Sequence, residues 1–397
     1  MTVHERSGDL TTREPIRVLI LTVSLRDYGP ARNLLYLATR CDRRRFRFEV
    51  CTMDRVSGGP VEQQFSGQSV PVHRLEMRGP FDLRALPRLL QLLRDFKPTV
   101  VHARLARACF YGRLAVHLMP RPKLLANVTG LYSQSFTSGH GRWLGRALYW
   151  IERATIGWSD LIVTNSVALA DDCAQVVGVP PAKLRTVYNA IDTAAFDAAT
   201  GRRNDLRSLH GVAPEQVVAI SVGRLHPRKR TVELVEWLHA SLRRQPAMLL
   251  WIVGHGQDRQ EVERAVAAHG LSERVRLFGE RHDIPELLAA ADIFVSASRW
   301  EGHPNVVLEA MAAGLPTVAF RVPGMTEAVE DGRTGFLADT PEEFRTAVER
   351  IGADAVLRSQ YSACARQRVR DRFSVPTMVA AFEGLYEELS GSDGVPG

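Results

Sequence analysis

From residue 16 onward, short apolar runs of strand length alternate with longer stretches in which apolar residues recur at helical spacing. This alternation is typical of βαβ units built around a parallel sheet. One series of runs predicts strands at 16–23, 46–53, 99–103, 123–128 and 161–165. A second series predicts strands at 217–222, 248–253, 275–279, 292–297 and 316–320. The intervening stretches predict helices at 31–40, 82–95, 231–244, 257–269, 284–290 and 305–313.

The two series are separated by a stretch at about 190–214 that is rich in polar and small residues and has no strong period. We interpret it as the connection between two α/β domains, each doubly wound. The chain has 397 residues, more than a single core usually organises, which also favours two domains. The predicted ranges are 1–200 for the first domain, 201–374 for the second, and 375–390 for a final amphipathic helix.

The composition is that of a soluble globular protein, with 45% hydrophobic and 24% charged residues. The five cysteines are scattered and none has metal-ligand spacing, so we expect reduced thiols in a cytoplasmic protein. The apolar N-terminal run "IRVLILTVSL" is too short to span a bilayer and lacks the features of a signal peptide. The sequence therefore predicts no membrane-spanning segment.

The formal net charge of +7 is partly concentrated in two segments. One is "RCDRRRFR" at 40–47, and the other is the predicted helix that carries Arg84, Arg88, Arg94 and Lys97. Such surfaces suit either solvent or an anionic lipid surface, and both interpretations stay open. The segment 142–158, where aromatic residues and arginines interleave, is either a buried helix or a peripheral contact with the inner membrane face. We find no nucleic-acid-binding module and expect no nucleic-acid partner.

Candidate chemistry follows the strands of the second series, because ligands of open parallel sheets bind beyond the carboxyl ends of the strands. Gly223, Arg224 and Lys229 follow the strand at 217–222, and a tight glycine before cations suits an anionic group. Arg281 follows the strand at 275–279. The dinucleotide fingerprint G-x-G-x-x-G is absent after the first strand, which disfavours a nicotinamide dehydrogenase. The phosphate loop of nucleotide triphosphatases and the G-x-S-x-G elbow are also absent.

Two carboxylates, Glu301 and Glu309, follow the strand at 292–297. Pro304 suits the start of a helix, and the backbone amides of Asn305 and Val306 would then be free to bind a phosphate or a sugar hydroxyl. If the intervening residues were all helical, the two acids would lie about 12 Å apart. That span is comparable to a nucleotide sugar, whose hexose and ribose both offer diols to a carboxylate.

Several blocks, in order along the chain, carry a resemblance to a known family. "EGHPNVVLEAMAAGLPTVAF" matches an E-x7-E block, "VGRLHPRK" a basic diphosphate loop, and "VPGMTEAVEDGRTGFL" the segment that follows. "YGPARNLLYLA" is similar to a Gly-Gly-Ala-x-Arg loop-helix, and "GVPPAKLRTVYNAIDTAAF" to the approach to a hinge. On these blocks the chain resembles the family-4 retaining glycosyltransferases of the GT-B fold. The resemblance implies two tandem Rossmann-like domains facing each other across a cleft, with the C-terminal helix returning to the first domain.

The resemblance also implies roles for individual residues. Arg224 and Lys229 would bind the donor diphosphate and stabilise the negative charge of the departing nucleotide. Glu301 would hold the hydroxyls of the transferred sugar, and these three residues form the catalytic set. Glu309 would bind the ribose, and Arg281 would lie near the nucleobase. The first domain would then bind the acceptor and the second domain the donor.

Further residues are implied by the same resemblance. The remaining donor-binding positions are Gly29, Gly223, Gly302, His303, Pro304, Asn305 and Val306. The acceptor-side positions are Arg32, Thr129 and Gly130. The chain departs from the family pattern at Tyr28 and Pro30, which stiffen the first loop, and at Thr129, where many members have histidine. A histidine contact to the reacting sugar is therefore not expected here.

The implied reaction moves a sugar from a nucleotide diphosphate sugar, by family frequency a UDP-sugar, to an acceptor hydroxyl with retained configuration. The acceptor would be a glycolipid, a polysaccharide precursor or a small metabolite such as an aminocyclitol. We expect no metal and no cofactor, because the helix N-terminus and the two cations can stabilise the diphosphate. A nucleotide-sugar epimerase or phosphorylase of the same architecture is the first alternative. A non-catalytic sugar- or lipid-binding protein is the second.

Overall fold

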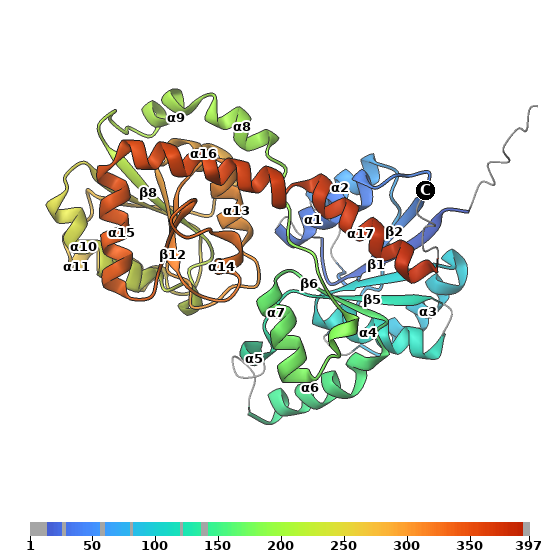
Figure 1. The fold of residues 1–397 in the computed structure, drawn as a ribbon. Helices are drawn as coiled ribbons and strands as arrows, with labels where there is room; N and C mark the ends of the chain where they lie inside the picture. Colours follow the sequence, from blue (N-terminus) through green and yellow to red (C-terminus); the bar gives the residue numbers. More distant parts are fainter. Residues whose placement is uncertain are drawn as a thin grey trace, which may run out of the picture. The chain divides into compact units, whose positions relative to one another are not determined.

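The structure is a computed structural model that describes residues 14–25, 29–55, 60–79, 82–119, 122–135 and 142–391 (Figure 1). Tyr28, one of the departures from the family pattern, lies outside these residues. The chain divides into two compact units, which we describe separately. Unit 1 comprises the described parts of Met1–Asn127, Thr155–Ile162 and Val379–Gly397, and unit 2 those of Val128–Ala154 and Val163–Met378. The predicted domain ranges stay a prediction.

The first sheet has seven strands in the order β3-β2-β1-β4-β5-β6-β7, and the pairs whose register is described are parallel. Its strands are β1 (Ile16–Thr22), β2 (Phe46–Thr52), β3 (Val72–Arg74), β4 (Val100–Arg104), β5 (Lys123–Val128), β6 (Leu161–Thr164) and β7 (Leu184–Thr186). The helices in this part of the chain are α1 (Gly29–Arg40), α2 (Pro60–Gly67), α3 (Ala85–Phe96), α4 (Ala106–Leu118), α5 (Tyr132–Ser135), α6 (Arg142–Thr155) and α7 (Val167–Asp172).

The second sheet has six strands in the order β10-β9-β8-β11-β12-β13, and its described pairs are also parallel. Its strands are β8 (Val217–Val222), β9 (Met248–Val253), β10 (Val275–Gly279), β11 (Ile293–Ser296), β12 (Thr317–Phe320) and β13 (Gly335–Ala338). The helices that follow the first sheet are α8 (Ala194–Thr200), α9 (Arg203–Leu209), α10 (Thr231–Arg244), α11 (Arg259–Ala268), α12 (Ile284–Ala290), α13 (Asn305–Ala312), α14 (Met325–Ala328), α15 (Pro341–Ala353), α16 (Ala355–Arg372) and α17 (Val375–Ser390).

The second sheet is buried on both faces, which explains the nearly continuous apolar runs of its strands. In β8, Val218 and Ile220 contribute to one core, together with apolar residues of α8, α9, α13 and α16. Ala219, between them in sequence, points to the opposite core, which contains residues of α10, α11 and α15. The two doubly wound α/β sheets predicted from the sequence are therefore confirmed.

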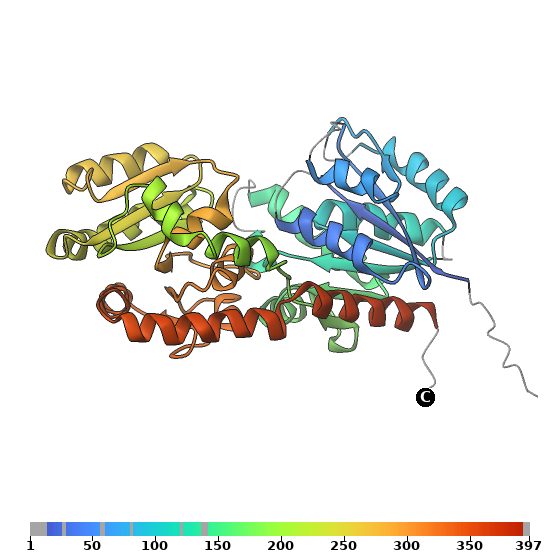
Figure 2. The same ribbon diagram turned by 90° about the horizontal axis from the view of Figure 1, so that it is seen from above.

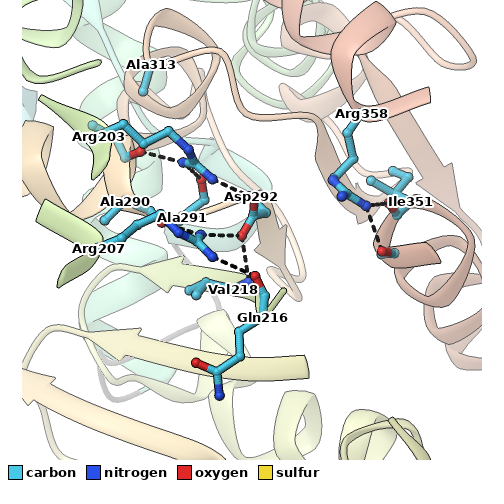
Figure 3. Close-up of polar contacts among 12 residues, drawn as sticks. Arg203, Arg207, Gln216, Val218, Ala290, Ala291, Asp292, Ala313, Ile351 and Arg358 are labelled. Atoms are coloured by element: carbon cyan, nitrogen blue, oxygen red, sulfur yellow. Dashed lines mark hydrogen bonds and ion pairs between the residues drawn. The ribbon is translucent and has the colours of Figure 1, made fainter. Parts of the chain in front are cut away.

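The segment 190–214, interpreted as the connection between the two domains, contains the helices α8 and α9, which the sequence did not predict. Phe196 and Leu206 from these helices are buried in the core of the second sheet. Asp292, just before β11, accepts hydrogen bonds from Arg203 (2.6 Å) and Arg207 (3.0 Å), as Figure 3 shows. In two helices this short, with scattered apolar residues, the helical spacing of apolar positions is too weak to predict them from the sequence.

The C-terminal helix α17 packs against the first sheet, which confirms the predicted return of this helix (Figure 2). The ring of Tyr386 lies 5.9 Å from the rings of both Phe46 and Phe48 on β2. Its hydroxyl is 2.8 Å from Nδ1 of His102 on β4. Burial lowers the pKa of His102 and raises the pKa of Tyr386, so both side chains are uncharged at neutral pH.

Candidate functional site

The loops that follow β8, β9 and β10 meet at one edge of the second sheet. The backbone N–H of Gly223 donates to the carbonyl of Val253 at 2.9 Å, and that of Gly254 donates to the carbonyl of Gly279 at 2.7 Å. A Cβ atom at Gly254 would lie 1.9 Å from the carbonyl oxygen of Gly223, so only glycine allows this approach. The φ angle of Gly254, 136°, is also one that other residues rarely adopt.

These loops surround a pocket of about 600 Å³, a size that suits a nucleotide. Arg224 and Arg281, both expected at a donor site, line it. The guanidinium of Arg281 is held by Asp283, with Nε 2.7 Å from a carboxylate oxygen. His255 and Glu280 also line the pocket. Neither of them was assigned a function from the sequence, although both follow strands of the second series.

Lys229 and Glu301 form an ion pair next to this pocket, with Nζ 2.5 Å from Oε1. Their side chains are 17% and 8% exposed, so the pair is largely shielded from water. Arg228 lies 3.8 Å from the other oxygen of Glu301 and stacks on the ring of Trp300 at 4.5 Å. A cation from the loop after β8 and an acid from the loop after β11 therefore meet, because these strands are neighbours in the sheet.

The turn that carries Glu301 is held by backbone contacts on both sides. The N–H of Arg299 donates to the carbonyl of Arg228 at 2.9 Å, and the N–H of Glu301 donates to that of Pro323 at 3.3 Å. A Cβ atom at Gly324 would lie 2.2 Å from the carbonyl oxygen of Gly302. Gly324 thus permits the close approach of two loops, and the Pro-Gly dipeptide was its only signal in the sequence.

His303 is buried and its side chain is directed into an aromatic cluster. Its ring centroid lies 5.0 Å from those of both Tyr188 and Phe373. Burial, with smaller effects from Arg368 and Arg372, lowers the pKa of His303 to about 3. The sequence grouped His303 with the donor-binding residues, and these ring contacts leave its backbone as the group that can contact a donor.

The helix α13 begins directly after Pro304. The carbonyl of Pro304 accepts from the N–H groups of Val307 and Leu308, so the N–H groups of Asn305 and Val306 precede the first intrahelical bond. Among the described residues, Oδ1 of Asn305 is buried without a hydrogen-bond partner. Glu309 is half-buried on the same helix. These groups provide donors and acceptors suited to a polar ligand.

The acceptor-side residues are divided between the two units. Thr129 belongs to unit 2 and its carbonyl lies against Gly302, where an added Cβ atom would be 2.7 Å away. Gly130 follows it and is half-buried. Arg32 is exposed on α1 in unit 1. Gly29, which was predicted on the donor side, is the first residue of the same helix.

Asn165 is an additional polar residue at this edge that the sequence reasoning did not identify. Its side-chain oxygen would lie 3.2 Å from a Cβ atom at Gly302, and within the described ranges it is buried without a hydrogen-bond partner. The only feature of the sequence that could have indicated Asn165 is its position as a polar residue at the end of the strand predicted at 161–165.

Two negative findings apply to the described part of the chain. No group of three or more His, Cys, Asp or Glu residues there is arranged to hold a metal ion. None of the helices described is both long enough and apolar enough to cross a membrane. The expected independence of metals and cofactors stays a prediction.

Two families match consecutive parts of the chain. Residues 29–195 match the family described as Glycosyltransferase Family 4, and residues 216–354 match the one described as Glycosyl transferases group 1. Together the two matches include every strand of the two sheets except β1.

Curated relatives are similar over most of the chain. The UDP-Gal:alpha-D-GlcNAc-diphosphoundecaprenol alpha-1,3-galactosyltransferase of Escherichia coli is 26% identical, over 78% of this chain and 80% of that protein. The alpha-D-kanosaminyltransferase of Streptomyces kanamyceticus is 27% identical, over 71% of this chain and 74% of that protein. Among solved structures, Anabaena HepE in complex with UDP-glucose has a TM-score of 0.77 and 22% identity, and the match covers 94% of this chain and all of HepE.

Proposed function

Because this chain belongs to the family-4 glycosyltransferases of the GT-B fold, we propose that it transfers a sugar from a UDP-sugar to an acceptor hydroxyl with retained configuration. One observation carries the proposal: Lys229 pairs with Glu301 beside a pocket that Arg224 and Arg281 line. A diphosphate needs cations and a sugar needs hydrogen-bond acceptors, and both are provided there. The complexes of HepE with UDP and UDP-glucose support the choice of nucleotide.

The cations act on the leaving group. As the glycosidic bond to the diphosphate breaks, negative charge accumulates on the phosphate oxygens. Arg224 and Lys229 stabilise that charge, with help from the backbone N–H groups of Asn305 and Val306 at the start of α13. Arg281, fixed by Asp283, supports the nucleobase end, and Glu309 receives the ribose hydroxyls. No divalent ion is needed for this charge distribution.

Glu301 has a second task once the donor is bound. The donor diphosphate competes for Lys229, and the carboxylate of Glu301 then accepts hydrogen bonds from the hydroxyls of the transferred sugar. The acceptor hydroxyl attacks from the side on which the diphosphate departs, and the leaving phosphate takes its proton. This front-face course retains configuration and requires no separate protein base.

The acceptor is bound by the part of the chain that precedes the second sheet. Thr129, Gly130 and Arg32 are the proposed contacts, and the position of Thr129 beside Gly302 supports the first of them. One of the relatives named above is named for transfer to a GlcNAc-diphosphoundecaprenol, and the other is named for transfer of kanosamine. We accordingly propose a glycolipid, a polysaccharide precursor or a small aminocyclitol as the acceptor class.

Product analysis tests the proposal. The protein is incubated with a panel of UDP-sugars, with and without lipid-linked and aminocyclitol acceptors, and the anomeric configuration of each product is determined by NMR. We expect an α-linked product from an α-linked donor only when acceptor is present. Conversion of the donor without acceptor would instead indicate an epimerase, phosphorolysis would indicate a phosphorylase, and an inverted product would contradict the mechanism.

A peripheral membrane contact remains a separate proposal. Trp150 and Ile151 on α6 are 60% and 40% exposed, and Arg153 on the same helix adds positive charge. An exposed amphipathic helix with tryptophan suits the lipid interface. Flotation of the protein with anionic liposomes would support this contact with the cytoplasmic face of the inner membrane. The absence of flotation would exclude it.

A further inference from the structure

A second pocket, of about 610 Å³, lies in unit 1 between the strands β1, β2 and β3 and the helix α3. Its lining contains five cationic side chains and only two carboxylates, which gives it a positive charge. The cations are Arg17, Arg47, Arg74, Arg88 and Lys97. The carboxylates are Glu49 and Asp95.

The pocket unites the two basic segments that the sequence showed separately. Arg47 comes from the arginine-rich run at 40–47, whereas Arg88 and Lys97 come from α3 and its C-terminal cap. Arg47 stacks on the ring of Phe96, with its guanidinium carbon 5.8 Å from the ring centroid. If these cations only faced solvent, their convergence from distant segments on one cavity would not be expected.

Arg74 is tightly paired with Glu62, whereas Arg47 and Arg88 are only loosely engaged by nearby carboxylates. Glu49 is 3.6 Å from Arg47 but only 2.8 Å from His73, so its closer contact is with the histidine. Arg88 is 3.8 Å from Glu76. Charge-assisted hydrogen bonds are normally about 2.7–2.9 Å long, so both arginine contacts are loose. Guanidinium groups held in this way keep hydrogen-bond donors for an additional anion.

The pocket is separate from the acceptor side of the same sheet. Arg17 and Arg47 are opposite each other in the register, one residue from the start of β1 and β2. Thr129, in contrast, follows the carboxyl end of β5. In a parallel sheet the amino ends and the carboxyl ends of the strands lie on opposite sides of the sheet. A ligand in the pocket therefore does not occupy the acceptor-side position.

We propose that this pocket binds a phosphate-bearing anion, either a soluble phosphorylated metabolite or a phospholipid headgroup. Arginine forks match phosphate oxygens with paired hydrogen bonds, and four of the five cations are arginines. The volume accommodates a sugar phosphate or a comparable headgroup. The site is independent of the transfer reaction, and its test measures binding only.

Calorimetry with inorganic pyrophosphate tests the soluble source. The protein is first saturated with UDP, so that the donor pocket does not contribute. The variant Arg47→Gln/Arg88→Gln removes one cation from each segment, and both side chains are more than half exposed, so the fold should persist. We expect it to weaken pyrophosphate binding by about tenfold or more, since the loss of even one hydrogen bond between charged groups is enough for a change of this size.

The matched control is Arg44→Gln/Arg94→Gln. It removes the same charge from the same two segments, and both residues are exposed and absent from the pocket lining. We expect less than about a twofold change in affinity, because the control loses only distant charge. Equal weakening by both double variants would overturn the proposal, since general surface charge would then explain the binding.

Vesicles distinguish the two sources of phosphate. Cosedimentation is measured with phosphatidylcholine vesicles that contain or lack phosphatidylglycerol. A loss of sedimentation with phosphatidylglycerol in the pocket variant, but not in the control, assigns the pocket to a headgroup. A loss of pyrophosphate affinity alone assigns it to a soluble ligand. If wild-type protein binds neither probe, or if the pocket variant binds both as wild type does, the proposal is wrong.

Discussion

Replacing either member of the Lys229–Glu301 pair should destabilise the fold as well as stop transfer. Lys229→Met keeps the length of the side chain and removes its charge, while Glu301→Gln keeps the shape of the acid. At a separation of 2.5 Å and an effective dielectric constant of about 20, two unit charges attract by about 6–7 kcal/mol. Removal of water from both groups offsets much of this attraction. Loss of one partner of a buried pair typically costs about 3–5 kcal/mol.

The structure places the two variants at or just below the lower end of that range. In Lys229→Met, Arg228 still lies 3.8 Å from Glu301, so we expect a loss of about 2–3 kcal/mol. In Glu301→Gln, Lys229 keeps its charge at 17% exposure without its acid, and we expect about 3–4 kcal/mol. The double variant leaves no unpaired charge of this pair and should lose less than the sum of the two single variants by about 2 kcal/mol.

Urea unfolding followed by tryptophan fluorescence measures these differences, because Trp237, Trp251 and Trp300 all lie in unit 2. Transfer should be abolished in all three variants, so activity and stability give independent information. If each single variant cost less than about 1 kcal/mol and the two costs were additive, the pair would not be a coupled buried interaction. Our reasoning on the site would then be refuted.

Three further changes have defined outcomes. The pKa of His303 is lowered from 6.5 to about 3, so its stabilising effect is complete above pH 6.5 and declines as the pH falls from there towards 3. When the pH is lowered from about 6.5 to about 4.5, the free energy of unfolding measured with urea should fall by about 2–3 kcal/mol less in His303→Phe than in wild type. An equal fall in the two proteins would contradict this. Gly254→Ala should weaken UDP binding by about tenfold or more in calorimetry because its Cβ would meet Gly223, whereas wild-type affinity would show that the loops rearrange freely. Glu309→Gln should weaken UDP binding by about tenfold in calorimetry, and unaltered affinity would remove its ribose role.

The elements predicted best from the sequence are central strands. The limits of β5, β8 and β9 coincide with the predicted ranges, because strands buried on both faces give uninterrupted apolar runs. The edge strand β10 also has the predicted limits, although most of its residues are only partly buried. Three other edge strands were missed. The strands β3, β7 and β13 have only three or four residues, too few to show a period. The helices α8 and α9 within 190–214 were not predicted for a related reason, since they gain their stability from the core of the second sheet.

The candidate site was predictable in its residue types but not in its internal contacts. The loops with Lys229 and Glu301 could each be located after a strand, whereas their pairing depends on β8 and β11 being neighbours. The same limit applied to His303, which the sequence grouped with its neighbours in the E-x7-E block. Its ring instead packs against Tyr188 and Phe373, which are distant in sequence. Contacts of this kind arise from tertiary packing and leave no local pattern.

The central claim is that the carboxyl ends of β8, β9, β10 and β11 bind one nucleotide diphosphate sugar. Hydrogen–deuterium exchange of the wild-type protein with and without UDP tests this location most directly. Our account predicts slower exchange in the loops at 223–230, 254–257, 279–284 and 299–306, the segments that surround the pocket and the Lys229–Glu301 pair. Protection confined to other segments, or no protection at saturating UDP, would contradict it.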